Sequence, residues 1–174
     1  ACIIRYGDDA NEGWLKERLG FVASPKEQPG ILHLATHGLL EKGMDLFSSL
    51  VLSQSDLEDG ALTVAEVFNE LDLRKTPIVV LSACNTALGS EGGGDEIVGL
   101  SRAFQYAGAR WVVASLWEVS DEASAKLMKA FHEQLAKGSA LDASIALANA
   151  QRETLQTKQW QHPFYWAAFV PYKR

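Results

Sequence analysis

The sequence predicts an α/β fold, a three-layer α/β/α sandwich in which helices cover both faces of a mostly parallel central sheet. Three short runs are predominantly apolar and do not alternate regularly with polar residues: Ile31–Thr36, Ile78–Ala83 and Trp111–Leu116. Continuous apolar runs of this length are typical of strands buried on both faces, as in a parallel sheet between helices. Amphipathic stretches separate these runs, and that alternation favours the three-layer arrangement.

Two of the intervening segments have helical spacing and a glycine at the end. The range Asp121–Lys137 places apolar side chains four residues apart on one face, and Gly138 follows it. The range Asp95–Ala107 repeats the pattern, and Gly108 follows. Apolar residues at this interval form one face of a helix, and glycine is the residue most often found just past a helix end. Both ranges are therefore predicted to be helices.

Local signals predict three further boundaries. Thr63 with Glu66, and Ser139 with Asp142, have the spacing of capping boxes, so a helix is expected to begin at each place. The run 164–170 is aromatic and β-rich and lies between two prolines, so it is predicted to be the last strand.

Composition and charge restrict the class of protein. With 174 residues, of which 47% are hydrophobic, the chain has room for one domain with a single large core. The net charge is −6 and the 16 Lys and Arg residues are scattered, which argues against a nucleic-acid surface. No apolar run approaches the roughly 18 residues of a membrane span. Two cysteines and the lack of a secretory signal pattern favour a reducing compartment, so we expect a cytoplasmic protein.

Two predicted strands run into residues that can take part in nucleophilic catalysis. Ile31–Thr36 is followed by His37 and Gly38, and Ile78–Ala83 is followed by Cys84. The carboxyl ends of parallel strands meet at one edge of a sheet, where sites gather. A nucleophilic thiolate needs an acid–base partner and backbone amides that hold an oxyanion, and a glycine lets its amide approach a substrate carbonyl. The alternative is that the cysteine is a small core residue.

Ordered blocks along nearly the whole chain resemble the CHAT domains, which are bacterial caspase-like peptidases related to caspases, separases and gingipains. The two signature blocks are His33-Leu-Ala-Thr-His37-Gly38 and Leu81-Ser-Ala-Cys84-Asn-Thr-Ala87. Four further blocks follow in the same order, at residues 94–104, 107–110, 114–119 and 162–169.

The resemblance implies that Cys84 is the nucleophile and that His37 protonates the leaving amine. The backbone amides of Gly38 and Cys84 would hold the oxyanion, and no third side chain is required because the backbone fixes the histidine. Asn85 stands where caspases have Arg or Gly, so strict aspartate-directed cleavage is not implied. The family domain usually begins upstream of residue 1, often after tetratricopeptide repeats. We therefore expect residues 1–174 to be a single CHAT-type domain, the C-terminal part of a longer multidomain chain.

Four acidic residues follow predicted strand ends on the rim that should carry the cysteine: Glu91, Asp95, Glu118 and Asp121. One interpretation is a negative substrate pocket that selects Arg or Lys, because a Leu-Trp-acid-Val block resembling residues 116–119 lies near that pocket in separases. The alternative for Asp95 and Asp121 is an electrostatic role at a helix N-terminus.

Other histidines and glycines do not predict a cofactor. His33 lies four residues before His37, but a zinc site needs three or four ligands and this spacing on a strand does not bring two rings together. We therefore expect no metal, and we interpret His33 as a hydrogen-bonded residue beside the site and His132 as part of a surface helix. The glycine-rich run 89–95 lacks the lysine of a phosphate-binding loop, so no nucleotide is expected.

The leading hypothesis is hydrolysis of a peptide bond in a protein substrate through an acyl-thioester intermediate. The expected partners are that substrate and either an upstream repeat domain or an activator protein, with no nucleic acid and no membrane. A catalytically silent or partner-activated interaction module is the main alternative. Acyl transfer by the same thiol is a third hypothesis, which uses the same residues.

Overall fold

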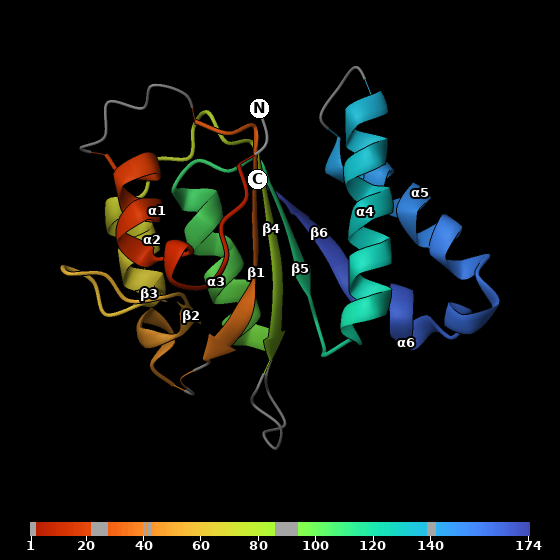
Figure 1. Cartoon of the computed structure of the whole chain (residues 1–174), viewed down its shortest axis with the longest axis horizontal. Helices are drawn as coiled ribbons and strands as arrows, with labels where there is room; N and C mark the ends of the chain where they lie inside the picture. Colours follow the sequence, from red (N-terminus) through yellow and green to blue (C-terminus); the bar gives the residue numbers. More distant parts are fainter. Residues whose placement is uncertain (1–2, 22–27, 40, 42, 86–93, 139–141) are drawn as a thin grey trace.

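A single six-stranded sheet organises the molecule (Figure 1). The computed structural model describes residues 3–21, 28–39, 41, 43–85, 94–138 and 142–174, with the backbone alone for 83–85 and 94–98. The strand order is β3-β2-β1-β4-β5-β6. The strands are β1 (Ile31–Leu39), β2 (Ser49–Val51), β3 (Ala61–Thr63), β4 (Ile78–Asn85), β5 (Trp111–Ser115) and β6 (Phe169–Lys173).

The middle of the sheet is parallel and its margins are antiparallel. The strands β1, β4 and β5 run in one direction, with β4 between the other two. The outer strands β2, β3 and β6 each pair antiparallel with the neighbour that lies nearer the centre, so the sheet as a whole is mixed. The three apolar runs that the sequence assigned to strands are these three middle strands, and the predicted parallel centre is confirmed.

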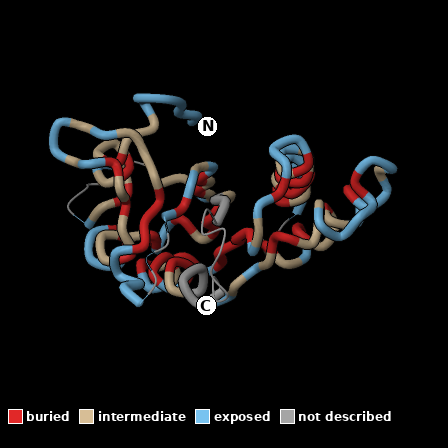
Figure 2. Tube along the Cα trace, turned by 90° about the horizontal axis from the view of Figure 1, so that it is seen from below, coloured by how far each residue is buried: buried red, intermediate tan, exposed pale blue. Residues whose placement is uncertain are grey.

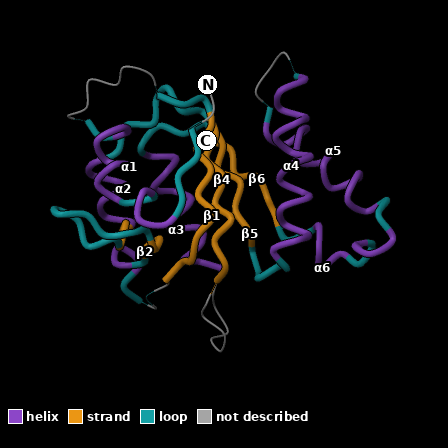
Figure 3. Tube along the Cα trace, in the orientation of Figure 1, coloured by secondary structure: helices purple, strands orange, loops and turns teal. Residues whose placement is uncertain are grey.

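Helices cover both faces of the sheet, which gives three layers (Figures 1 and 3). One face carries α1 (Glu12–Leu19), α2 (Val64–Glu70) and α3 (Gly94–Tyr106). The other face carries α4 (Asp121–Lys137), α5 (Ala143–Leu155) and the short α6 (Pro163–Trp166). Three 3₁₀ turns complete the described elements: η1 (Gly7–Asp9), η2 (Asp45–Phe47) and η3 (Lys158–Trp160).

The alternation of side chains along the strands divides the core into two clusters, one on each face of the sheet. Figure 2 shows the buried segments in red. Leu32 of β1 and Val79 of β4 pack with α1, α2 and α3. The residues on either side of Val79, Ile78 and Val80, pack with α4 and α5. Because both faces of these strands are apolar, the sequence shows continuous runs instead of alternation.

The prediction of a strand at residues 164–170 is wrong for the first part of that range, which belongs to a short helix. Pro163 is the first residue of α6, where its missing N–H costs nothing, and the imidazole Nδ1 of His162 accepts the N–H of Phe164 at 3.2 Å. The strand β6 begins only at Phe169 and includes Pro171. It pairs with β5 and lies at the edge of the sheet, where a proline is tolerated.

One of the two predicted capping boxes is confirmed and the other is wrong. At α2, the Thr63 hydroxyl accepts the Glu66 N–H at 3.2 Å and the Glu66 carboxylate accepts the Thr63 N–H at 2.8 Å. At α5, the N-cap is Asp142 itself, whose carboxylate accepts the N–H groups of Ser144 and Ile145. Ser139, the expected cap, lies outside the described residues. The carboxylate at position 142 is thus the cap instead of the third helical residue.

Within the described part of the chain, no helix combines the length and the apolar character that crossing a bilayer requires.

Candidate active site

The strands β1 and β4 place residues 37 and 84 side by side. Their parallel ladder is continuous from Ile31 opposite Ile78 to Gly38 opposite Asn85, and within it His37 and Cys84 are Cα partners. Neighbouring strands lie about 4.8 Å apart, so the backbone brings together the two residues that the sequence singled out. The sequence expected both residues just past strand ends, whereas both strands include them. We refer to this pair as the candidate dyad.

The candidate dyad lies on the face of the sheet that α4 and α5 cover. Residues two apart along a strand share a face. On β4, Ile78 and Val80 face α4 and α5, and position 84 has the same parity. On β1, Ile31 packs against the same cluster, and His37 again has the same parity. Because positions 37 and 84 are in register on two parallel strands, both lie on the same face of the sheet.

On this face, the residues of β1 become more exposed to solvent toward the carboxyl end of the strand. His33 is partly buried, whereas Ala35 and His37, the next two residues on the same face, are exposed. The helix layer thus covers the beginning of the strand and leaves its later part accessible to solvent. An accessible imidazole is what acid–base chemistry on an external substrate requires.

The carboxyl end of β1 is held on both sides. Gly38 is buried and pairs with Leu50 of β2 on one side and with Asn85 of β4 on the other. The Thr36 hydroxyl donates a hydrogen bond to the backbone carbonyl of Val51. Two neighbouring strands therefore hold the backbone that carries His37 in position.

Below the candidate dyad, three side chains from three elements form a hydrogen-bonded chain. The Nδ1 atom of His33 lies 3.0 Å from Nε2 of His132 on α4. The Nε2 atom of His33 lies 3.0 Å from the hydroxyl oxygen of Ser82 on β4. The interpretation of His33 as a hydrogen-bonded residue is thus confirmed. We call these residues the His132–His33–Ser82 chain.

His132 lies on the expected surface helix, α4, but its side chain is partly buried and contacts His33 of the sheet. The helical spacing contains the signal that would have placed it. Position 132 is four residues after Met128 and three before Leu135, both of which are buried on the same helix. Positions at these intervals share a face, so a polar residue there faces the core.

Burial keeps the two histidines of this chain neutral at neutral pH. Burial, with a smaller contribution from the nearby charge of a protonated His132, lowers the pKa of His33 to about 4. Burial also lowers the pKa of His132. A neutral imidazole carries one N–H donor and one nitrogen acceptor, so each ring can donate at one nitrogen and accept at the other.

Two of the four acidic residues lie at the predicted edge. Glu118 and Asp121 are exposed and follow the carboxyl end of β5, the neighbour of β4. Asp121 is also the first residue of α4, behind the N-cap Ser120, so it suits the positive end of that helix. The backbone places Asp95 in the first turn of α3, and Glu91 lies outside the described residues, as does most of the glycine-rich run 89–95.

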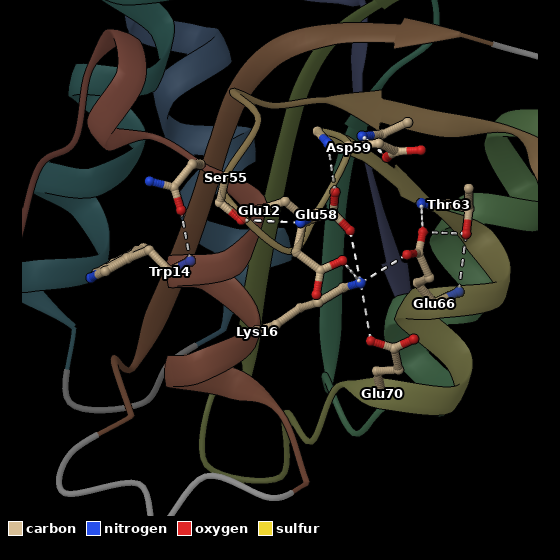
Figure 4. Close-up of polar contacts among 12 residues, drawn as sticks. Glu12, Trp14, Lys16, Ser55, Glu58, Asp59, Thr63, Glu66 and Glu70 are labelled. Carbon is tan, nitrogen blue, oxygen red and sulfur yellow. Dashed lines mark hydrogen bonds and ion pairs between the residues drawn. The ribbon is translucent and has the colours of Figure 1, made fainter.

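Among the described residues, one group of acidic side chains has the spacing of a metal site. The carboxylates of Glu12, Glu58 and Glu66 offer oxygen atoms within 4.8 Å of one another. The ammonium of Lys16 lies among them, 2.8 Å from a carboxylate oxygen of each (Figure 4). An internal cation therefore already provides the positive charge, and these carboxylates hold the fold together.

This lysine joins three segments that are distant in the sequence. Glu12 is on α1 with Lys16, Glu58 precedes β3, and Glu66 is on α2, as is Glu70 at 3.0 Å (Figure 4). The side chain of Glu12 is fully buried, and its other oxygen accepts the Gly60 N–H at 2.9 Å. We call these five charged residues the Lys16 cluster.

The pKa shifts in the Lys16 cluster follow from burial and from the ammonium. Burial raises the pKa of Glu12 more than Lys16 lowers it. Burial acts in the same direction on Glu66, but hydrogen bonds from Lys16 and Thr63 outweigh it and lower the pKa of that carboxyl. Burial would lower the pKa of Lys16, yet four carboxylates raise it instead.

Comparison with known proteins gives the chain a family. The family model described as "CHAT domain" matches residues 2–174. The human tetratricopeptide repeat protein 28 is 36% identical over 114 residues, and the mouse protein of the same name is 39% identical over 115 residues. Each match covers 66% of this chain and only 4% of the relative's own length. Both relatives are mammalian, so proteins similar to this chain are not confined to bacteria, as the resemblance had suggested.

The family model covers nearly the whole chain, and the parallel middle strands between two helical layers agree with a caspase-like fold. The chain therefore belongs to the CHAT-domain family, the family of domains related to caspase-like cysteine peptidases.

Proposed function

We propose that this domain is a cysteine endopeptidase in which Cys84 is the nucleophile and His37 the acid–base residue. The observation that supports this proposal most is the Cα pairing of Cys84 with the exposed His37, in a chain of this family. Two strands that hold these positions in register provide the preorganisation that a nucleophile and its base need.

The reaction follows from that arrangement. The Cys84 thiol transfers its proton to the His37 imidazole, and the sulfur forms a bond with the carbonyl carbon of the peptide. The backbone amides of Gly38 and Cys84 donate hydrogen bonds to the resulting oxyanion. When the C–N bond breaks, the His37 imidazolium gives its proton to the leaving amine. Water then attacks the thioester, and the thiol and the acid product are released.

A labelling experiment tests the dyad. The purified domain is treated with iodoacetamide at pH 7, and mass spectrometry follows Cys84 and Cys2 separately, so that Cys2 is an internal control. Cys84 should react at least about tenfold faster than Cys2, because a neighbouring imidazole increases the thiolate fraction. His37→Ala should slow Cys84 by about tenfold and leave Cys2 unchanged.

The labelling result also separates the competing functions. A Cys84 that reacts no faster than Cys2, or whose rate does not depend on His37, would contradict the peptidase. The partner-activated module is the second candidate, because the relatives are named as repeat proteins and the chain matches only 4% of their length. It predicts that Cys84 becomes reactive only after an upstream repeat domain or an activator protein is added.

We further propose that the acidic residues at the edge select a basic residue before the cleaved bond. Glu118 and Asp121 are exposed beside the dyad strands, and Glu91 and Asp95 would extend the same pocket. A fluorogenic peptide library should give at least about tenfold higher kcat/KM for Arg or Lys than for Leu at that position, the effect of one desolvated charge pair. The double variant Glu118→Gln, Asp121→Asn should remove the preference. Equal turnover of Leu, Met or Asp peptides would disprove the basic pocket.

A further inference from the structure

The His132–His33–Ser82 chain lies on the face of the sheet that carries the candidate dyad. His33 has the same parity on β1 as His37, four residues earlier. Ser82 has the same parity on β4 as position 84, two residues earlier, and is the Cα partner of the exposed Ala35. Two residues along a strand span about 7 Å. The Ser82 hydroxyl therefore stands at the boundary between the helix-covered part of the face and its open part.

Both ring nitrogens of His33 are occupied, and this couples the two hydrogen bonds to each other. A neutral imidazole has one N–H. If Nδ1 of His33 donates to His132, then its Nε2 must accept the hydroxyl proton of Ser82. If His132 donates to Nδ1, then Nε2 donates to Ser82 and the hydroxyl proton is free to point elsewhere. The contact at α4 thus determines which way the Ser82 hydroxyl is oriented.

We infer that His33 and His132 are positioning residues for the proposed reaction, which hold the Ser82 hydroxyl in one orientation beside the candidate dyad. This inference rests on the proposed function. A fixed hydroxyl dipole two residues before position 84 on the same strand would stabilise a thiolate formed there. The same contacts make the orientation depend on the packing of α4, because His132 is on that helix.

The protonation states on this face support a neutral chain during the reaction. Burial is the main reason why the pKa of His33 is lowered to about 4, and the charge of a protonated His132 acts in the same direction. Burial lowers the pKa of His132 as well. The other titratable positions on this face of β1 and β4 are His37 and residue 84. Because both pKa values are lowered, both rings of the chain are neutral at neutral pH, and each keeps one N–H donor and one nitrogen acceptor there.

At Ser82 and at His132, a matched pair of variants separates the effect of losing the hydrogen-bonding group from the effect of changing the side-chain volume. Ser82→Thr retains a hydroxyl, and Ser82→Val has the same branched shape without it. His132→Gln retains a polar group at the Nε2 position, and His132→Met has similar length without one. Met128→Leu, in the same layer of α4, is the control for packing, because Met128 is buried and apolar. The readout is the rate of iodoacetamide labelling at Cys84 between pH 5 and pH 9.

We expect Ser82→Thr, His132→Gln and Met128→Leu to stay within about twofold of the unmodified domain, since each retains the relevant contact. Ser82→Val and His132→Met should slow the labelling of Cys84 by about three- to tenfold, the effect of one hydrogen bond. They should also move the midpoint of the pH profile by about half a unit. A loss of packing alone would change the thermal midpoint and leave the pH profile where it is.

The same measurements distinguish the failure of this inference from the failure of the proposed function. If Cys84 of the unmodified domain shows no dependence on His37, the proposed function and the inference are both wrong. If that dependence is present but the two members of each pair label at equal rates with equal pH profiles, the inference alone is overturned. Either pair is sufficient, so an unfolded Ser82→Val variant still leaves the His132 pair to decide.

Discussion

Replacing Lys16 with methionine is expected to lower the free energy of unfolding by about 3–5 kcal/mol at pH 7, the usual cost of removing one partner from a buried ion pair. Lys16 is 11% exposed and lies within 3.0 Å of four carboxylates. Without the ammonium, the fully buried Glu12 has no opposite charge, and the other carboxylates repel it. Glu70 is 47% exposed, so water screens its share of the repulsion.

Chemical denaturation with urea measures this loss. Lys129→Met is the matched control, because Lys129 is exposed on α4, and its effect should stay within about 0.5 kcal/mol. Adding Glu12→Gln to Lys16→Met should recover part of the loss, since it removes the buried charge and leaves an oxygen that can accept the Gly60 N–H. A loss below about 1 kcal/mol for Lys16→Met would show that the cluster is solvated and weak.

The pH dependence of the Lys16→Met variant has a definite sign. Crowded carboxylates without a cation have folded-state pKa values above their unfolded values. The penalty is therefore present at pH 7 and decreases as the pH falls through those raised values. The difference between the unmodified domain and the variant should be smaller at pH 5 than at pH 7. A constant difference would mean that the carboxylates do not interact.

The second large effect is a loss of stability in mild acid that depends on His33. The pKa of this ring is about 4 in the folded state, against 6.5 in the unfolded state. Between these values the unfolded chain binds a proton that the folded chain does not, so stability falls as the pH falls from 6.5. The loss from this group reaches about 3 kcal/mol at pH 4, and none of it is present above about pH 7. His132 adds to it in the same direction, because its pKa is lowered as well.

Urea unfolding of the domain at pH 7, 6, 5 and 4 tests this loss. His33→Asn removes the ring and should flatten the curve between pH 6.5 and pH 4 by about the amount that the shifted pKa accounts for. The carboxylates contribute their own dependence in both proteins, so the difference between the two curves isolates the histidine. Parallel curves for the two proteins would show that His33 titrates normally in the folded state.

Much of the fold could be predicted from the sequence because its signals are local. The three apolar runs became the parallel strands β1, β4 and β5, and the range Asp121–Lys137 became α4 with the same bounds. The spacing of apolar residues in a helix, and the glycine that follows its last turn, involve only residues that are close in the sequence. The short strands β2 and β3, of three residues each, gave no such signal. Their pairing with β1 gives them their extended form.

The C-terminal segment shows where local reasoning fails. Aromatic and β-branched residues at 164–170 favour a strand, yet Pro163 begins a helical turn capped by His162. Trp160 is buried in the core cluster beneath α4 and α5, and Tyr165 and Trp166 pack against that cluster. Tertiary packing of these rings overrides the β propensity of the segment.

The sequence by itself determined the fold class, the family and the two residues of the candidate dyad. The apolar runs and the signature blocks that indicate them each consist of residues that are consecutive in the chain. Only the tertiary structure decided which side chains surround them. It brought His132 to His33 across 99 positions of the chain, and it brought Lys16 to Glu66 across 50. Such contacts arise when helices pack onto a sheet and bury polar groups that must then find partners. No pattern of neighbouring residues specifies which partner a buried imidazole or ammonium will meet.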